Sequence, residues 1–410
     1  MLNFSIRTKS LLRATRILSQ GPSDIPTIDN SIGTVELFSS VVRVIGDAEK
    51  NELILLLSNL IYFGAIIVIK GDDENNLEVK ESGQVSVLIK NLQNALANED
   101  AATIKVKENQ DSLGIKTKHG TLHLNLYSTK FDEYQKLLDG RDQRDKEGFV
   151  FTLSHEQMRK IISQITYACA KKNQYRPILE AVNFHIEPKK EKQFLMRCAA
   201  TDSYRMAIRE DLIKVKGYTE EKAYSKNVSA KTLIPIGKML AYADDKKVST
   251  VIHCTSDLMM FSFDAEENCH VDVVSNLVSG RYPDVRNVIP PRFTTKVDVD
   301  RDTLFHVLDR ISMMKTNGIS VCKFEISKNA FIVTSFVPEI GSTEEKIKKY
   351  NIKGDAVTAS FNTKYLMDIL KSMEGDTMSL YLNGGHAPMQ LIDDQKDCVL
   401  DLIVPLSETR

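Results

Sequence analysis

The sequence predicts an α+β fold in which one structural unit occurs three times. A short strand followed by an amphipathic helix is expected near residues 8, 154 and 301, at spacings of 146 and 147 residues. A second helix is expected near residues 84, 229 and 362. After each second helix, apolar and polar residues alternate as in antiparallel strands joined by turns. This internal repetition indicates a duplicated architecture. Each unit should therefore carry antiparallel sheets covered on one face by two helices.

The composition is that of an ordinary globular protein. The chain has 410 residues, of which 42% are hydrophobic and 27% are charged, with 54 Lys and Arg against 55 Asp and Glu. These values exclude a disordered, collagen-like or multi-span membrane chain. The six cysteines are scattered and no CxxC motif occurs. The cysteine pattern argues against a disulfide scaffold or a zinc finger and favours a reducing, cytoplasmic location.

The first unit contains two features that could be mistaken for targeting or membrane segments. Leu2–Ile6 alternates like a strand, and a basic helix is expected over residues 8–19. A transit peptide is the alternative, since the first 23 residues carry basic residues and no acid. Leu53–Ile69 is uncharged, but polar residues and Gly64 interrupt it, so we expect two buried strands around a turn. A membrane span, which needs about 20 apolar residues, is the weaker alternative.

Two polar segments divide the chain. They are Leu137–Gly148 and Ile289–Lys296. The predicted units are therefore residues 1–147, 148–293 and 294–410, called units one, two and three below.

The predicted helices are unusually basic. They cover residues 8–19, 84–97, 153–172, 229–243, 301–316 and 362–374. Together they contain 15 Lys and Arg but five Asp and Glu, a net charge of +10 in a chain whose total is −1. A solvated helix face usually mixes both signs, because ion pairs one turn apart stabilise it.

A basic helical surface of this kind favours contact with a polyanion. Duplex DNA carries one negative charge per ~1.7 Å of its axis, or roughly 20 phosphates per turn. Two protomers would supply about that many positive charges, so the surface is expected to surround duplex DNA without reading its sequence. The predicted DNA-facing residues on these helices are Lys9, Arg13, Arg16, Lys90, Arg159, Lys160, Lys171, Lys172, Lys231, Lys238, Arg310, Lys315, Lys364 and Lys371.

Motifs for catalysis are missing from the sequence. There is no phosphate-binding glycine loop, no GxGxxG and no GxSxG elbow. His155 and Glu156 open a zinc-protease pattern, but Arg159 stands where the second histidine is required. We expect no catalytic residues, no metal and no cofactor.

One Cys/His cluster remains, formed by His253, Cys254, Cys269 and His270. Adjacent residues on a strand point to opposite faces, so each pair could offer one ligand. Two ligands are fewer than the three or four that zinc takes from proteins. A metal-dependent hydrolase using these residues is the alternative of another functional class.

Several segments of units two and three resemble the β sliding clamp of bacterial DNA polymerase III. They are Tyr175–Val182 (YRPILEAV), Ala200–Glu210 (ATDSYRMAIRE), Gly280–Pro290 (GRYPDVRNVIP), Phe361–Leu370 (FNTKYLMDIL) and Leu400–Leu406 (LDLIVPL). The segments occur in the order and at the distances of that family over residues 150–410. The first 150 residues are similar in layout only.

The resemblance implies three domains of the DNA clamp type per chain and a ring-shaped homodimer. Twelve helices would line a central hole, with the sheets outside, and Asn173 and Arg176 would lie near its rim. The implied function is a non-catalytic DNA sliding clamp that encircles duplex DNA and tethers the polymerase for processive replication. The implied location is the bacterial cytoplasm, at the nucleoid. An accessory paralogue used in repair or carried by a mobile element is the alternative within the family.

The resemblance also implies a pocket between units two and three that binds short peptides. Its partners would be the polymerase III catalytic subunit, the clamp loader, translesion polymerases and mismatch-repair proteins. The implied pocket residues are Leu179, Thr201, Ser203, Tyr204, Arg205, Met206, Pro283, Val288, Asn362, Tyr365, His386, Pro388, Val404, Pro405 and Leu406. An apolar groove with a polar margin suits peptides with Leu, Met or Phe anchors.

Overall fold

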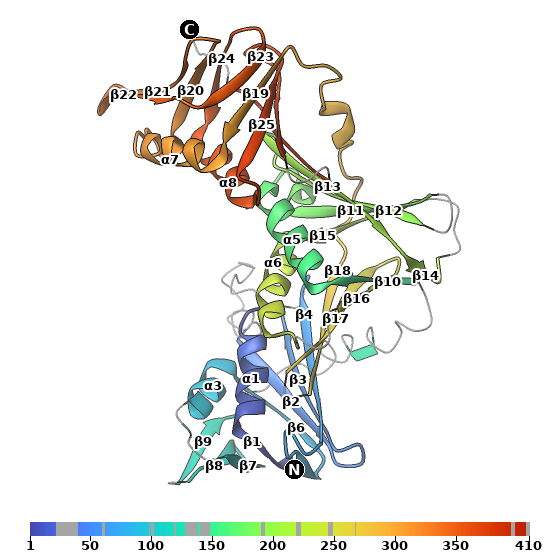
Figure 1. Cartoon of the computed structure of the whole chain (residues 1–410). Helices are drawn as coiled ribbons and strands as arrows, with labels where there is room; N and C mark the ends of the chain where they lie inside the picture. The colour runs from blue at the N-terminus through green and yellow to red at the C-terminus, as the bar shows by residue number, and fades with distance from the viewer. Residues whose placement is uncertain are drawn as a thin grey trace.

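Six α-helices and 27 strands are present in the part of the chain that the structure, a computed structural model, describes. That part comprises residues 1–21, 40–59, 62–97, 99, 102–118, 120–127, 138–139, 148–189, 193–218, 223–244, 249–266, 268–394 and 398–406. Most of the predicted linker 137–148 lies outside it. The units follow one another in an arc, with the helices towards its inner side and most of the sheet area outside (Figure 1).

Unit one carries the helices α1 (Thr8–Leu18) and α3 (Ile89–Ala97). Its strands are β1 (Asn3–Arg7), β2 (Val41–Asp47), β3 (Glu52–Ser58), β4 (Gly64–Lys70), β5 (Glu78–Glu81), β6 (Gly83–Leu88), β7 (Thr103–Glu108), β8 (Ser112–Lys116) and β9 (Thr121–Asn125). The uncharged run Leu53–Ile69 forms the antiparallel pair β3 and β4, so the two-strand prediction is confirmed. Every helix that the structure describes is too short or too polar to span a bilayer.

Unit two carries α5 (His155–Ile165) and α6 (Ala230–Met239). Its short 3₁₀ turns are η1 (Thr166–Ala168), η2 (Pro177–Glu180), η4 (Leu240–Tyr242) and η5 (Val285–Val288). Its strands are β10 (Phe149–Ser154), β11 (Ala181–Pro188), β12 (Phe194–Thr201), β13 (Arg205–Ile213), β14 (Val215–Lys216), β15 (Tyr224–Ser229), β16 (Ser249–Cys254), β17 (Leu258–Ala265) and β18 (Cys269–Asn276). Ser154 caps α5, as its sequence position indicates, and forms a capping box with Gln157.

Unit three repeats this layout with α7 (Arg301–Ile311) and α8 (Thr363–Ser372). Its strands are β19 (Thr295–Asp300), β20 (Val321–Ile326), β21 (Phe331–Val337), β22 (Gly341–Ile347), β23 (Tyr350–Gly354), β24 (Val357–Asn362), β25 (Thr377–Leu382), β26 (Met389–Asp393) and β27 (Val399–Ile403). All strand pairs that the structure describes are antiparallel, which confirms the predicted sheet type. The unit bounds themselves stay predictions.

Four predicted helices are clearly shorter than expected, and one of them, the second of unit two, ends at Met239 and continues as a 3₁₀ turn. Residues 84–88 belong to β6, because Val85 and Val87 alternate and pair with β2. The first helix of unit two ends at Ile165, where the Thr166 hydroxyl donates to the Ile162 carbonyl and a 3₁₀ turn follows. The first helix of unit three ends at Ile311. As a result Lys171, Lys172 and Lys315 lie in the segments that follow helices.

Two sheets of nine strands extend across the unit boundaries. Their strand orders are β14-β10-β16-β17-β18-β4-β3-β2-β6 and β15-β11-β12-β13-β27-β26-β25-β19-β23. Unit one is joined to unit two by β4 and β18, and unit two is joined to unit three by β13 and β27. A five-stranded sheet, β5-β1-β7-β8-β9, remains in unit one, and a four-stranded sheet, β22-β21-β20-β24, remains in unit three.

One pairing rule produces both boundaries. The third strand after the first helix of a unit pairs with the last strand of the following unit. In units one and two these third strands are β4 and β13. The corresponding strand of unit three is β22, and the last strand of unit one is β9. Each of them is an edge strand of its sheet within the chain.

Candidate functional site

A cavity of about 240 Å³ lies on the outer face of the sheet where β13 and β27 join. It is lined by Arg176, Leu179, Thr201, Ser203, Arg205, Met206, Pro283, Asp284, Val285, Val288, Pro388, Leu402 and Val404. Both units contribute side chains to it, and most of them are apolar. The cavity therefore depends on the contact between units two and three.

Strand pairing places the apolar floor of this cavity. Met206 is opposite Leu402 across the β13–β27 pair, so both side chains point to the same face of the sheet. The ladder continues past β27, because the Val404 amide donates to the Tyr204 carbonyl at 2.8 Å. The Thr201 amide donates to the Tyr282 hydroxyl at 3.0 Å and ties the segment before η5 to the sheet. Strand pairing and backbone hydrogen bonds thus fix the floor of the cavity without a ligand.

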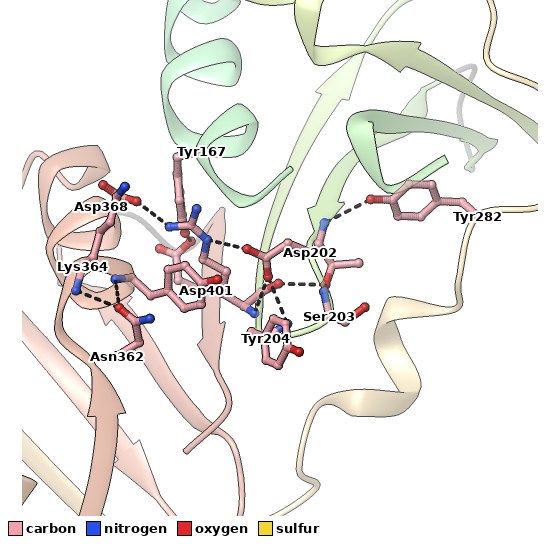
Figure 2. A network of polar contacts seen from close by, with 12 residues as sticks. Tyr167, Asp202, Ser203, Tyr204, Tyr282, Asn362, Lys364, Asp368 and Asp401 are labelled. Atoms are coloured by element: carbon pink, nitrogen blue, oxygen red, sulfur yellow. Dashed lines mark hydrogen bonds and ion pairs between the residues drawn. The ribbon is translucent and has the colours of Figure 1, made fainter. Parts of the chain in front are cut away.

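A tight turn between β12 and β13 forms one rim. The Asp202 carboxylate accepts hydrogen bonds from the amides of Tyr204 and Arg205, both at 3.0 Å (Figure 2). The Thr201 hydroxyl oxygen accepts from the Ser203 amide at 3.1 Å. Ser203 has φ +80°, in the left-handed region that side chains other than glycine seldom adopt. These hydrogen bonds therefore hold Ser203 in its strained backbone conformation.

Arg205 connects the two units behind this rim. Its Nε donates to Asp202 at 3.0 Å and its Nη1 donates to Asp368 of α8 at 2.7 Å (Figure 2). The guanidinium carbon lies 4.3 Å from the ring centroid of Tyr365 and 5.3 Å from that of Tyr167. Its side chain is 6% exposed, so these contacts are largely shielded from water.

A second polar contact crosses the same boundary. The Tyr167 hydroxyl, from η1, donates to a carboxylate oxygen of Asp401 on β27 (Figure 2). Burial raises the pKa of Asp401 to about 7. The hydrogen bond from Tyr167 lowers this pKa, and the charge of Asp393 raises it further. Burial also raises the pKa of Tyr167 well above its ordinary value.

Nine of the predicted pocket residues line the cavity. They are Leu179, Thr201, Ser203, Arg205, Met206, Pro283, Val288, Pro388 and Val404. Tyr204 and Tyr365 lie beside it, with ring centroids 6.4 Å apart. Asn362 caps α8 by accepting from the amides of Lys364 and Tyr365. His386, Pro405 and Leu406 are not among the lining residues, and the Leu406 amide donates to the Ser360 carbonyl at 2.7 Å.

Four lining residues lie outside the predicted pocket set: Arg176, Asp284, Val285 and Leu402. Arg176 is the one that we expected near the DNA. Leu402 could have been found from the strand period, since it alternates with the inward residues of β27. The other three lie in loops and turns, so no periodic sequence pattern predicts that they reach the cavity.

The predicted DNA-facing residues divide into two groups. Several are in ion pairs within the chain: Arg13 with Glu266, Lys160 with Glu156 and Glu374, Lys231 with Glu180, and Arg310 with Glu345. The others are exposed and have no ion pair within the described part of the chain: Lys9, Arg16, Lys90, Arg159, Lys171, Lys172, Arg176, Lys238, Lys315, Lys364 and Lys371. Asn173 accepts from the amides of Tyr175 and Arg176.

The hydrolase alternative is wrong. Cys254 pairs with Met259, which in turn pairs with Ser275 of β18, six positions from Cys269. At about 3.3 Å per residue the two cysteines are roughly 20 Å apart along the strands and the two histidines, four positions apart, roughly 13 Å. The described residues contain no group of three or more His, Cys, Asp and Glu side chains that could hold a metal ion.

Comparison with known proteins identifies relatives over most of the chain. The profile of the DNA polymerase III beta subunit, central domain, matches residues 152–284, and that of its C-terminal domain matches residues 286–407. The beta sliding clamp of Staphylococcus epidermidis is 27% identical over 365 residues, which is 88% of this chain and 90% of the relative. That of Staphylococcus aureus is 27% identical over 364 residues, with the same coverage.

Solved structures share the fold. The DNA polymerase sliding clamp of Bacillus subtilis superposes with a TM-score of 0.82 at 22% identity, and all of both chains is covered. The DNA polymerase III beta chain of Streptococcus pneumoniae gives 0.80 at 20% identity, covering 99% of this chain and 100% of that one. The superpositions include unit one, where the sequence motifs are similar in layout only.

Proposed function

Because this chain belongs to the DNA polymerase III beta subunit family, the bacterial sliding clamps, we propose that two copies close into a ring around duplex DNA and tether the polymerase through a peptide bound at the β13–β27 boundary. Members of this family are non-catalytic processivity subunits, so the nucleotide-transfer chemistry belongs to the polymerase. The proposed place of work is the nucleoid in the bacterial cytoplasm.

The main observation in favour of the ring is the strand-pairing rule. It is satisfied twice within the chain, and it leaves β22 and β9 as edges that could satisfy it a third time. These edges are at opposite ends of the chain, so β22 of one copy would pair with β9 of the other, and the same contact would occur twice. A head-to-tail contact that repeats in this way closes a ring and pairs the β9 and β22 edges of both copies.

Exposed apolar side chains support the same contact. Leu122 on β9 is 44% exposed although its strand neighbour Ile115 is in the core. Met313, two residues after α7, is 73% exposed. Burial of such side chains against a second copy would stabilise the pair, since each buried aliphatic side chain contributes about 1.5–3 kcal/mol.

The proposed DNA contact uses the helices on the inner side of the arc. Lys9 of α1, Lys90 of α3 and Lys238 of α6 are exposed on three different helices. Each would contact phosphates, which carry no sequence information, so the ring could slide. The ion-paired basic residues of the same helices would contribute less, because an acid already neutralises them.

The ring is tested by solution mass. The wild type is expected to have twice the chain mass of 46.2 kDa by light scattering and to form an annulus in negative-stain images. Leu122→Asp should give the single-chain mass, because a carboxylate would be buried at the proposed edge contact. The matched control is Leu212→Asp, an exposed strand leucine of unit two that should leave the mass doubled. A single-chain wild type would reject the ring.

The DNA contact is tested by charge reversal. Changing Lys9, Lys90 and Lys238 to Glu should shorten the retention of the loaded protein on nicked circular DNA and reduce its dependence on salt. Lys107, Lys216 and Lys353 are exposed on strands and form the control set. Equal retention by the two triple variants would remove the helices from the proposed DNA contact.

A further inference from the structure

The two walls of the proposed peptide pocket belong to different units. Met206 comes from β13 of unit two, whereas Leu402 and Val404 come from the end of unit three. Each unit has its own interior in this region, because the apolar core of unit three is separate from the core that contains unit two. The width of the pocket is therefore set by whatever holds the two units together around it.

Arg205 is placed to hold them. It is bound to Asp202 of its own unit and to Asp368 of the other, with its guanidinium between the rings of Tyr167 and Tyr365. Each unit thus supplies one carboxylate and one aromatic ring. A planar guanidinium with several fixed donors specifies the geometry of such a contact more narrowly than apolar packing does.

Tyr167 makes the second connection. Its ring lies against Arg205, and its hydroxyl donates to Asp401, 234 residues further along the chain. Asp401 is 1% exposed, and within the described part of the chain its Oδ2 has no hydrogen-bond partner. The carboxyl group is faced by Tyr167 from η1 and by Asp393 from β26. A buried carboxyl group with one hydrogen bond tolerates little displacement of that partner.

We propose that Arg205, Tyr167, Asp368 and Asp401 form a latch that sets the distance between the two walls of the pocket. Tyr167, Asp368 and Asp401 are not among the residues that line the cavity, so they act as positioning residues for partner binding. This inference rests on the proposed peptide-binding function. It adds that the affinity for a peptide depends on residues that the peptide does not contact.

The test compares two single variants with a matched control. Asp368→Asn keeps the shape of the side chain but removes its charge, and Tyr167→Phe keeps the ring but removes the hydroxyl. Glu325→Gln removes an exposed ion pair with Lys323 on β20 of the same unit. The probe is a fluorescein-labelled decapeptide whose only apolar residues are Leu and Phe, and its Kd is measured at 25 °C, well below thermal unfolding.

We expect each latch variant to weaken peptide binding about tenfold, the effect of losing one hydrogen bond to a charged group. The control should bind like the wild type, and all three should keep the wild-type solution mass. A positioning role also separates binding from stability. The double variant Tyr167→Phe with Asp401→Leu should regain the wild-type melting temperature, because no unpaired carboxyl group is left buried. Its Kd should stay about tenfold weaker, because the connection between the two units is still missing.

Two outcomes separate the possible failures. If the latch variants melt at lower temperature but bind the peptide with unchanged Kd, the residues are structural and the latch is rejected. If neither the wild type nor Met206→Ala binds the peptide, the pocket assignment itself is rejected. The latch would then have no peptide-binding function to support.

Discussion

The two unit boundaries within the chain follow one strand-pairing rule but differ in what lies around the paired strands. At the first boundary, β4 and β18 are continuous with one apolar core that fills both units. At the second, β13 and β27 join units whose cores are separate. The same backbone connection is thus surrounded by apolar packing in one case and by a polar network in the other.

The outer faces of the two boundaries also differ, in how completely their apolar side chains are covered. At the first, Ile66, Met260 and Val274 belong to a buried apolar cluster on which Leu138 packs. At the second, Met206 and Leu402 belong to a cluster that is partly covered by Tyr282 and Val285 and partly open as the cavity. A duplicated unit can therefore give a rigid connection or a binding site, depending on how completely its outer apolar face is covered.

The largest expected effect is at the second boundary. Arg205→Met should lower the free energy needed to separate unit three from unit two by about 3–5 kcal/mol. The reason is that Asp202 and Asp368 then remain without their cation where water is largely excluded. Urea unfolding should then show unit three separating earlier. The control is Arg310→Met, which breaks an exposed pair with Glu345 and should cost less than about 1 kcal/mol. Equal losses would show that the network contributes no more than a surface pair.

The first boundary is probed by a cavity in its core. Ile67→Ala removes a fully buried side chain of β4 that pairs with Val271 and should cost about 3 kcal/mol. Since units one and two share one core, their unfolding transition should shift as one. Ile369→Ala, in the core of unit three, should shift the other transition. Separate shifts for units one and two would contradict a shared core.

The pH dependence of the second boundary is expected to come from Asp401. Its pKa is about 7 in the folded protein, above the ordinary value of 3.8, so the folded state holds a proton that the unfolded state releases. Stability should therefore fall as the pH rises between about 4 and 7, by at most about 1.4 kcal/mol per pH unit. Asp401→Asn should remove this slope in chemical unfolding at several pH values. An unchanged slope would assign the titration to another group.

The smallest effect belongs to the first boundary. Hydrogen bonding to Asp272 and Asp264 raises the pKa of His270, so its contribution is complete below pH 6.5 and is lost as the pH rises through the folded pKa. The ring is partly exposed, and water screens it, so His270→Gln should cost less than about 1 kcal/mol at pH 5.5 and still less at a pH above the folded pKa. A loss that is independent of pH would point to packing instead of charge.

Local pattern predicted most of the fold and part of the site. The starts of α1, α6, α7 and α8 lie within one residue of the predictions, because each follows a strand with a clear change of period. The β6 strand was missed, since Val85 and Val87 fit the helical pattern of α3 as well as a strand. The cavity residues on β13 follow from the family resemblance, whereas Leu402 on β27 does not. Val285 and Asp284 lie on a 3₁₀ turn and its cap, where no period exists.

The repeated unit, the antiparallel strands and the excess of positive charge on the helices follow from the amino-acid order alone, because they depend on neighbours a few residues apart. The pairing of strand edges, the apolar face that stays open and the contact of Tyr167 with Asp401 across 234 residues are visible only in the folded chain. A local period specifies which face of an element is apolar, whereas a contact between distant residues depends on how whole units dock against each other.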